Sequence, residues 1–168
     1  MFNLSDAKPS LWKEVFESGE LLHCFNCGSC ISGCPASEAG EPLLIRNLAR
    51  KVILGLEEEL EDDDTPWACV TCSRCEEMCP MDVKPFELSL AIRRWQCRID
   101  DTRIPPVLPE FFERGYTQPV EQKELRKSLG LDEIQSLGAV PGLLEKFQAM
   151  LREVDVIKNN AYMFGGGQ

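Results

Sequence analysis

Two stretches of this chain share one pattern of cysteines: Cys24-Phe25-Asn26-Cys27-Gly28-Ser29-Cys30-Ile31-Ser32-Gly33-Cys34-Pro35 and Cys69-Val70-Thr71-Cys72-Ser73-Arg74-Cys75-Glu76-Glu77-Met78-Cys79-Pro80. Both follow C-x2-C-x2-C-x3-C-P, so eight of the nine cysteines belong to the two motifs. Each cysteine of the second motif lies 45 positions after its counterpart, as Cys69 does after Cys24. The constant offset indicates an internal duplication.

The spacing of these thiols is typical of proteins that bind iron-sulfur clusters. Three thiolates with two residues between each pair, on one tight loop, can face three corners of one cubane. The fourth corner lies out of their reach. In two-cluster ferredoxins with this spacing, the fourth cysteine of one motif ligates the cluster of the other motif. We therefore expect two 4Fe-4S clusters. The expected ligands are Cys24, Cys27, Cys30 and Cys79 for cluster 1, and Cys69, Cys72, Cys75 and Cys34 for cluster 2.

Two other uses of cysteine explain the pattern less well. Zinc sites also use C-x2-C pairs, but a four-coordinate zinc leaves the third and fourth cysteines of each motif unexplained. A disulfide framework requires an oxidising compartment and usually an even cysteine count, whereas this chain has nine. The prolines also favour clusters with exchanged ligands, because Pro35 and Pro80 disfavour helix at the preceding cysteine and send the chain out of the loop.

Composition and charge narrow the class of protein further. The formal net charge of -10 over 168 residues makes nucleic acid a poor partner. No apolar run approaches the ~18 residues of a membrane span, and the opening Met1-Phe2-Asn3-Leu4-Ser5-Asp6 does not resemble a signal peptide. We expect a cytoplasmic protein without a membrane span. With one histidine and no Ser-His-Asp or HExxH pattern, the sequence identifies no catalytic residues.

The segments around the motifs predict helices and no strands. Pro42 can open a helix that Gly55 caps, and Pro85 opens a second. A shorter helix is expected over Leu11, Trp12, Val15 and Phe16, ending near Gly19. The apolar positions at helical spacing are Leu44, Ile45, Leu48, Ala49, Val52 and Ile53 in the first copy, and Leu88, Ala91, Ile92 and Trp95 in the second. We therefore expect an all-α fold, a helical ferredoxin-like domain with a C-terminal helical extension.

The extension is expected to occupy residues 105–168, after a two-cluster domain over residues 1–104. Pro105-Pro106 and Pro109 should break the chain, and helices should follow at 110–114, 122–129 and 141–154. The last of these has Leu143, Leu144, Phe147, Met150, Leu151 and Val154 at core spacing. The apolar Tyr162-Met163-Phe164 near the end either docks on a partner or frays.

Several other residues are open to two interpretations. The acidic stretch 57–64 is expected to be a solvated connector, with docking to a basic partner as the alternative. His23 could tune or ligate a cluster, but eight available thiolates favour a surface or supporting role. Cys97 is expected to be a buried apolar residue rather than a ninth ligand, and Trp67 to pack rather than carry electrons. A solvated helix face or a partner contact could explain Arg93, Arg94 and Arg98, and the solvated face is favoured.

On these residues the chain resembles the C subunit of heterodisulfide reductase, over roughly residues 20 to 155. The resemblance rests on the two motifs joined by a basic amphipathic helix, on Trp67, and on Phe112-Glu113-Arg114-Gly115 and Lys127-Ser128-Leu129-Gly130-Leu131-Asp132-Glu133. Iron-sulfur subunits of succinate dehydrogenase and glycolate oxidase share the motifs. The chain lacks the C-x4-C-x2-C run of the succinate dehydrogenase subunit. It also lacks the CCG module found in glycolate oxidase and in heterodisulfide reductase D. The membrane anchor of the related quinone-interacting subunit is absent as well.

The resemblance implies an electron-transfer subunit of a soluble complex in anaerobic metabolism. Its partners would be a flavoprotein like the A subunit of heterodisulfide reductase and a protein with CCG modules like the B subunit. A hydrogenase, formate dehydrogenase or NADH-oxidising module could act through the flavoprotein. The resemblance fits three reactions of the complex. They are the reduction of CoM-S-S-CoB, a bacterial reaction coupled to NADH or hydrogenase modules, and sulfur oxidation in the reverse direction. One alternative is a freestanding ferredoxin, but such a carrier does not need the 70 residues beyond Arg98. Another is a scaffold protein with purely structural clusters, but a scaffold would need only one cluster.

Overall fold

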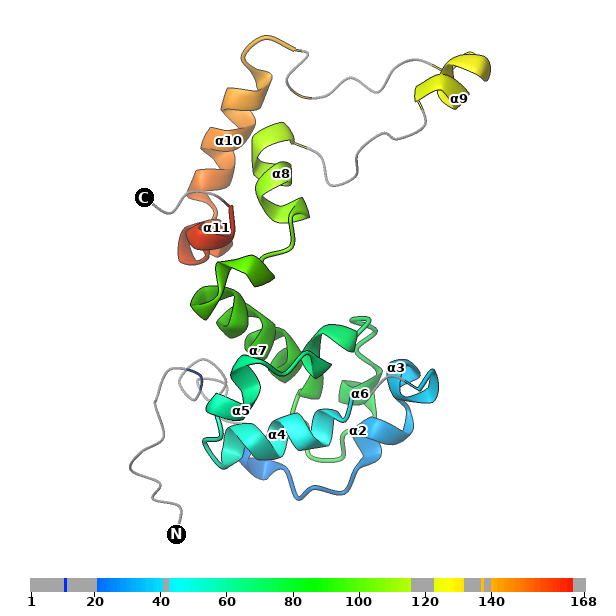
Figure 1. Cartoon of the computed structure of the whole chain (residues 1–168), viewed down its shortest axis with the longest axis vertical. Coiled ribbons are helices and arrows are strands. Elements are labelled where there is room, and N and C mark those ends of the chain that lie inside the picture. Colours follow the sequence, from blue (N-terminus) through cyan, green and yellow to red (C-terminus); the bar gives the residue numbers. More distant parts are fainter. Residues whose placement is uncertain are drawn as a thin grey trace. The chain divides into compact units, whose positions relative to one another are not determined.

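A computed structural model of the chain describes residues 11, 21–40, 43–115, 123–131, 137 and 140–164 (Figure 1). All regular secondary structure in these residues is helical, which confirms the expected all-α fold. The chain forms two compact units, Met1–Ile99 and Asp100–Gln168. The boundary comes directly after the long helix that ends at Ile99, a few residues before the division that the proline pattern suggested.

The first unit holds both cysteine motifs. Its helices are η2 (Leu21–His23), α2 (Ser29–Ser32), α3 (Pro35–Glu38), α4 (Ile45–Ile53), α5 (Glu58–Glu61), η3 (Thr65–Ala68), α6 (Arg74–Glu77) and α7 (Pro85–Ile99). Helices α2 and α6 occupy equivalent places in the two motifs and pack against each other. Helices α4 and α7, which follow the motifs, also pack together. The two copies of the duplicated sequence therefore meet through their equivalent helices.

Helix α4 buries one side and ends at a glycine. Ile45, Leu48, Ala49 and Val52 are buried at the spacing of one helix face. Leu44 was expected on the same face but precedes the helix and is 41 % exposed. After the helix, the Gly55 N–H donates to the Val52 carbonyl at 3.0 Å, and the Leu56 N–H donates to the Lys51 carbonyl at 2.9 Å. These two bonds form a Schellman motif, whose left-handed position suits Gly55 (φ +69°) and confirms the predicted cap.

Helix α7 begins at Pro85, as predicted, because the missing N–H of a proline is harmless in the first helical turn. Leu88, Ala91, Ile92 and Trp95 are all buried, which confirms the periodicity of this segment. Their side chains join the buried residues of α4 in one core. The core thus lies directly behind the cysteine loops, where it can fix their position.

The acidic stretch 57–64 is exposed at most of its positions, as a solvated connector should be, but not at Glu57 and Leu60. Glu57 is only 5 % exposed, and its Oε1 accepts a hydrogen bond from the Leu11 N–H at 3.3 Å. Leu60, in the middle of the stretch, is fully buried. A run of acidic residues does not reveal which carboxylates have partners in the fold, so the prediction failed at the buried positions.

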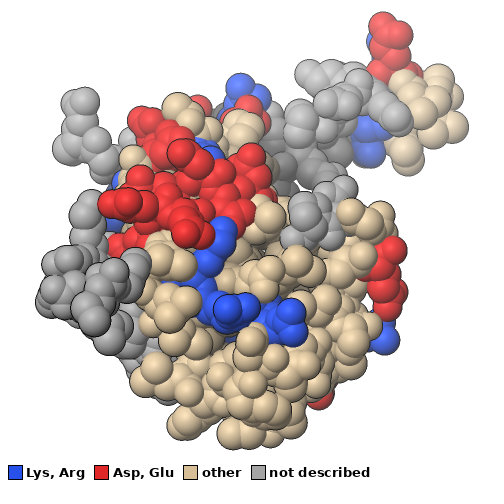
Figure 2. Space-filling view, turned by 60° about the horizontal axis from the view of Figure 1, so that its bottom comes forward, with Lys and Arg blue, Asp and Glu red and all other residues tan. Residues whose placement is uncertain are grey.

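A salt bridge joins this stretch to helix α4. Lys51 Nζ donates to Asp63 Oδ2 at 2.7 Å, and both side chains are largely covered. Burial alone would raise the pKa of Asp63, but hydrogen bonds from Lys51 and Thr65 lower the pKa below its ordinary value. Figure 2 shows acidic side chains gathered on one area of the surface beside a band of basic ones. The Lys51–Asp63 pair itself joins α4 to the segment between the two motifs.

The second unit is a smaller set of helices. They are η4 (Asp101–Arg103), α8 (Val107–Arg114), α9 (Lys123–Ser128), α10 (Leu143–Glu153), α11 (Asp155–Asn159) and η6 (Ala161–Phe164). Helices α8 and α10 pack together, with the rings of Phe111 and Phe147 edge to face and their centroids 5.5 Å apart. Pro109, expected to break the chain, is the third residue of α8. It is tolerated there because the first N–H groups of a helix have no partner within the helix.

The apolar stripe predicted on α10 is wider than the surface that its neighbours cover. Leu144, Phe147 and Leu151 are half-buried, whereas Leu143, Met150 and Val154 are exposed. Periodicity predicts the side of a helix that can be buried. Among the described residues, α8 and α11 are the main elements packed against α10, and they cover only part of that side.

The apolar segment near the end of the chain is ordered. Tyr162, Met163 and Phe164 belong to η6, are half-buried, and lie in an element that contacts α8. The expectation of a frayed end is therefore wrong for these residues. Part of the surface that a partner was expected to bury is covered by the same unit.

Some predictions fall outside the described residues. Leu11 is helical and fully buried, but the rest of its predicted helix, with Trp12, Val15 and Phe16, lies outside them, as does Pro42. In the described part of the chain, every helix is too short or too polar to cross a membrane.

Candidate metal centres

The two cysteine loops have the same backbone. Asn26 and Thr71, just before the second cysteine of each motif, have φ angles of +64° and +57°. Gly28 and Ser73, just after it, have φ angles of +86° and +58°. Residues other than glycine rarely adopt these angles. Their recurrence at equivalent positions means that the motif demands this geometry, which brings three thiols to one side of each loop.

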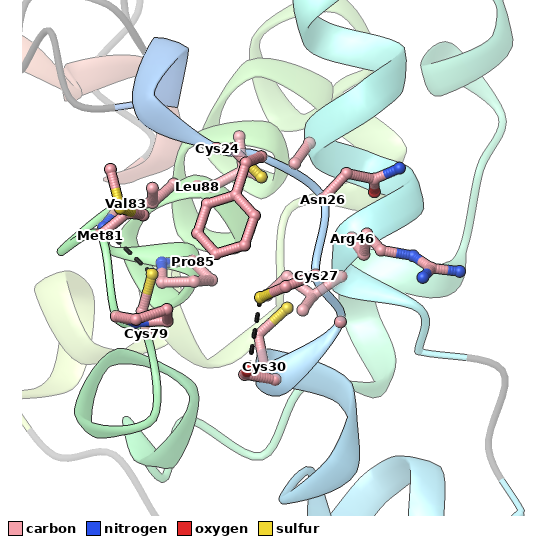
Figure 3. A pocket seen from close by; sticks show the side chains of 16 residues that line it. Cys24, Asn26, Cys27, Cys30, Arg46, Cys79, Met81, Val83, Pro85 and Leu88 are labelled. Atoms are coloured by element: carbon pink, nitrogen blue, oxygen red, sulfur yellow. Dashed lines mark hydrogen bonds between the residues drawn. The ribbon is translucent and has the colours of Figure 1, made fainter.

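Cys24, Cys27 and Cys30 of the first motif share a cavity with Cys79 of the second. The cavity has about 440 Å³ of space, part of which is open to solvent. In Figure 3 the sulfur atoms of these four residues are directed toward one space, and Cys79 faces the others from the opposite side. Apolar side chains of α4 and α7 line the cavity on its inner side: Ile45, Ala49 and Leu88.

Hydrogen bonds already reach two of these sulfur atoms. The Val83 N–H donates to Cys79 Sγ at 3.4 Å (Figure 3). Cys27 Sγ lies 3.3 Å from the Ser29 hydroxyl, and hydrogen bonds from Ser29 lower the pKa of Cys27 below its ordinary value. Such bonds stabilise thiolates and tune the potential of a cluster that they ligate.

A second cavity, of about 340 Å³, is lined by Cys69, Cys72 and Cys75 of the second motif and by Cys34 of the first. Cys30 borders both cavities. Each motif proline lines the same cavity as the cysteine before it: Pro35 lines the second cavity and Pro80 lines the first. Cys34 has an extended backbone before Pro35 starts α3, so the helix begins only after the thiol is placed.

The thiols of both motifs are in the reduced form that a metal site requires. All nine cysteines are described, and none forms a disulfide. In the described part of the chain, no three ligand side chains converge closely enough to hold one metal ion. Burial, together with the neighbouring thiols, raises the pKa of Cys30 to about 11 and that of Cys75 to about 12. Metal binding must therefore displace protons from both thiols, so it releases protons and is favoured by higher pH.

A contact between the two motifs occurs at equivalent positions. The Sδ of Met78 occupies the place where a side chain on Gly33 would begin. Gly33 is buried, and its counterpart 45 residues later is Met78 itself. Gly33 therefore lets α2 and α6 approach closely, which brings the two loops together.

Arg93 does not lie on the solvated helix face that was expected. Its side chain is half-buried, and it donates hydrogen bonds to the backbone carbonyls of Pro66 and Cys69. Burial lowers the pKa of Arg93, while the nearby Cys69 thiolate opposes that shift. Trp67 packs under the guanidinium, as predicted, and its Nε1 donates to Gln96 Oε1 at 2.7 Å. The sequence did contain a signal for this buried polar contact. Three polar residues of α7 are spaced four and three positions apart, which places them on one face of the helix: Ser89, Arg93 and Gln96.

His23 and Cys97 lie outside both cavities. His23 is exposed and lines neither cavity, which agrees with a surface role. Cys97 is 1 % exposed within α7 and also lines neither cavity, so its predicted burial is confirmed. Residues that the sequence did not single out include four exposed apolar side chains next to or near the cysteines: Leu22, Phe25, Val70 and Met81.

The fold and the two cysteine-lined cavities define the class of protein. Residues 20–83 match the family described as a 4Fe-4S dicluster domain, and this span contains all eight motif cysteines. The chain is therefore an iron-sulfur protein of the dicluster type.

Its relatives define the family. A protein of Archaeoglobus profundus that is described as similar to the heterodisulfide reductase C subunit is 39 % identical over 137 residues, which cover 79 % of this chain and 72 % of the relative. The iron-sulfur C subunit of the CoB--CoM heterodisulfide reductase of Methanopyrus kandleri is 31 % identical, over 90 % of this chain and 80 % of that protein. The C subunit of the H(2):CoB-CoM heterodisulfide,ferredoxin reductase of Methanothermobacter marburgensis is 31 % identical, with 82 % and 72 % covered. This chain belongs to the family of heterodisulfide reductase C subunits.

Proposed function

We propose that this protein passes single electrons through two 4Fe-4S clusters inside a heterodisulfide-reductase-type complex. The observation that carries the proposal is that each cavity is lined by the first three cysteines of one motif and the fourth cysteine of the other, with Cys30 also at the border of the second cavity. Four thiols around one space are the ligand set of such a cluster. The proposed ligands are Cys24, Cys27, Cys30 and Cys79 for cluster 1, and Cys69, Cys72, Cys75 and Cys34 for cluster 2.

A bound cluster supplies the ability to accept and release one electron at a time. The chain supplies the environment in which that happens. The Val83 N–H stabilises the sulfur of Cys79, and the Ser29 hydroxyl stabilises that of Cys27. Ile45 is buried and lies against both cavities, where it supplies an apolar wall.

The partners that we propose are a flavoprotein of the A-subunit type on one side and a protein with CCG modules, of the B-subunit type, on the other. Flavins and disulfides exchange electrons in pairs, and two one-electron carriers between them can divide and recombine such a pair. The names of the relatives support this role, since they describe subunits of multi-subunit reductases of the CoB-CoM heterodisulfide. The complex is proposed to work in the cytoplasm.

Metal analysis of anaerobically prepared protein tests the cluster assignment. Four iron and four sulfide are expected for each of the two clusters, with a brown colour that dithionite bleaches. Two zinc atoms per chain without acid-labile sulfide would exclude the proposal.

Purification from the native source tests the place in a complex. The protein should co-purify with a flavoprotein and with a CCG-containing protein. A monomer that rapidly exchanges electrons with several unrelated enzymes would instead establish a freestanding ferredoxin.

A further inference from the structure

The segment that leads into Cys69 is held by a cation. Arg93 Nε donates to the Pro66 carbonyl at 2.8 Å, and its Nη2 donates to the Cys69 carbonyl at 2.6 Å. The guanidinium carbon also lies 5.3 Å from the centroid of the Trp67 ring. One side chain thus contacts three of the four residues that end in the first thiol of the second motif.

The first motif has no guanidinium at the equivalent place. The position 45 residues before Arg93 is Leu48, a residue of α4 that is 1 % exposed and has no side-chain donor. The counterpart of Trp67 is Leu22, which is exposed. Arg46 borders the first cavity from a different place on α4, where its Nη1 lies beside Gly28 and its buried Nε has no hydrogen-bond partner.

We propose that Arg93 is a positioning residue that fixes the loop of cluster 2 and raises the reduction potential of that cluster but not of cluster 1. The inference rests on the cluster ligation proposed above. It goes beyond that proposal, because it assigns the two clusters different electrostatic surroundings.

The physical reason is that reduction adds a negative charge to the cluster. A guanidinium remains a cation at every physiological pH, so it favours the reduced form of any cluster close to it. Arg93 is half-buried, and water therefore screens its charge less than that of an exposed arginine. The two bonds to Pro66 and Cys69 also use the planar fork of the guanidinium, which lysine cannot reproduce.

The test is a redox titration followed by electron paramagnetic resonance on the full-length protein with both clusters. The wild type should show two one-electron steps. In Arg93→Gln, one step should move to lower potential by about 59 mV, which corresponds to a tenfold smaller equilibrium constant for one-electron reduction. Arg93→Lys keeps the charge, so it should restore most of the potential, while its altered loop changes the signal shape. Arg50→Gln removes an exposed charge from α4 and should leave both steps in place.

Arg46→Gln assigns the steps, because Arg46 borders only the first cavity. It should move the step that Arg93→Gln leaves unchanged. If both variants move the same step, or if Arg93→Gln binds two clusters with unchanged potentials, the inference is wrong. If Arg93→Gln loses cluster 2, Arg93→Lys decides: binding of cluster 2 at the wild-type potential supports the role of the charge, and binding at a clearly lower potential excludes it. A wild type without two one-electron steps would contradict the proposed function itself.

Discussion

The two cysteine motifs share a backbone and differ in what surrounds it. The loop geometry recurs at Asn26 and Thr71 and again at Gly28 and Ser73, and α2 and α6 follow at the same offset. The residues behind the loops have diverged, and the position of Arg93 in the second copy is a buried leucine in the first. Ligand geometry tolerates little change because four thiols must face one space. The surroundings can change, and they are where two similar sites acquire different properties.

A second pair of counterparts differs in the same way. Lys51 of α4 and Gln96 of α7 lie 45 positions apart, and both bind the segment between the motifs. Lys51 pairs with the side chain of Asp63, whereas the buried Gln96 donates to the carbonyls of Leu60 and Asp63 at 2.7 and 2.8 Å. The first copy holds the segment by charge near the surface, and the second holds it by a buried amide.

The sharpest way to break the comparison is to remove the exchanged ligands. Cys34→Ala should eliminate cluster 2 and spare cluster 1, and Cys79→Ala should do the reverse, because each of these thiols lines the cavity of the other motif. About half of the iron should be lost in each variant, and thermal stability should fall because cluster binding is coupled to folding. Electron paramagnetic resonance of the reduced variants identifies the cluster that remains.

The control for both variants is Cys97→Ala, which changes a buried cysteine that lines neither cavity. It should keep both cluster signals. Loss of the cluster of its own motif in both Cys34→Ala and Cys79→Ala would show that each motif is self-contained, contrary to the exchange of ligands.

The next effect concerns the two counterparts that hold the connecting segment. Gln96→Leu leaves the Trp67 N–H and the Leu60 and Asp63 carbonyls without their partner, so it should lower the free energy of unfolding by about 3 kcal/mol. Lys51→Met removes a charged bond closer to solvent and should cost about 1 kcal/mol. Urea unfolding of the cluster-loaded protein measures both. Equal losses would mean that burial does not distinguish the two copies.

The smallest effect tests the shared backbone. Gly28→Ala places a side chain on a residue at φ +86°, with Arg46 Nη1 3.3 Å from the new atom, and should cost about 1 to 2 kcal/mol. Ser73→Gly removes the strain of a serine at φ +58° but makes the unfolded chain more flexible, so its net effect should stay within about 0.5 kcal/mol of zero. Thermal unfolding compares the two. A larger loss for Ser73→Gly would mean that the serine side chain, rather than the angle, stabilises its loop.

Features that depend on neighbouring residues in the chain were predictable from the sequence. The cap at Gly55, the start of α7 at Pro85 and the buried side of α7 follow from local geometry and periodicity. The pattern of eight cysteines also indicated that each loop shares a cavity with the fourth cysteine of the other motif, because two-cluster ferredoxins with this spacing exchange that ligand.

Features that depend on distant partners were not predictable. Arg93 and Glu57 are charged residues in charged surroundings, and only the fold shows that one binds two carbonyls and the other binds the Leu11 N–H. The predicted burial of the whole apolar stripe of α10 was wrong for the same reason, because periodicity does not show how much surface a neighbouring helix covers. Met150 is 60 % exposed at a position that the pattern assigned to a core.

The contact between Gly33 and Met78 bears on the origin of the domain. These residues are counterparts, as are α2 and α6, and two copies of an object touch at equivalent points only along a two-fold axis. A pseudo-symmetry axis therefore passes between α2 and α6. Under the proposed ligation, one copy of the repeat supplies three thiols to one cluster and a single thiol to the other, so neither copy can complete a cluster alone. The arrangement resembles a homodimer whose two protomers exchange one cysteine each, with both protomers joined in one chain.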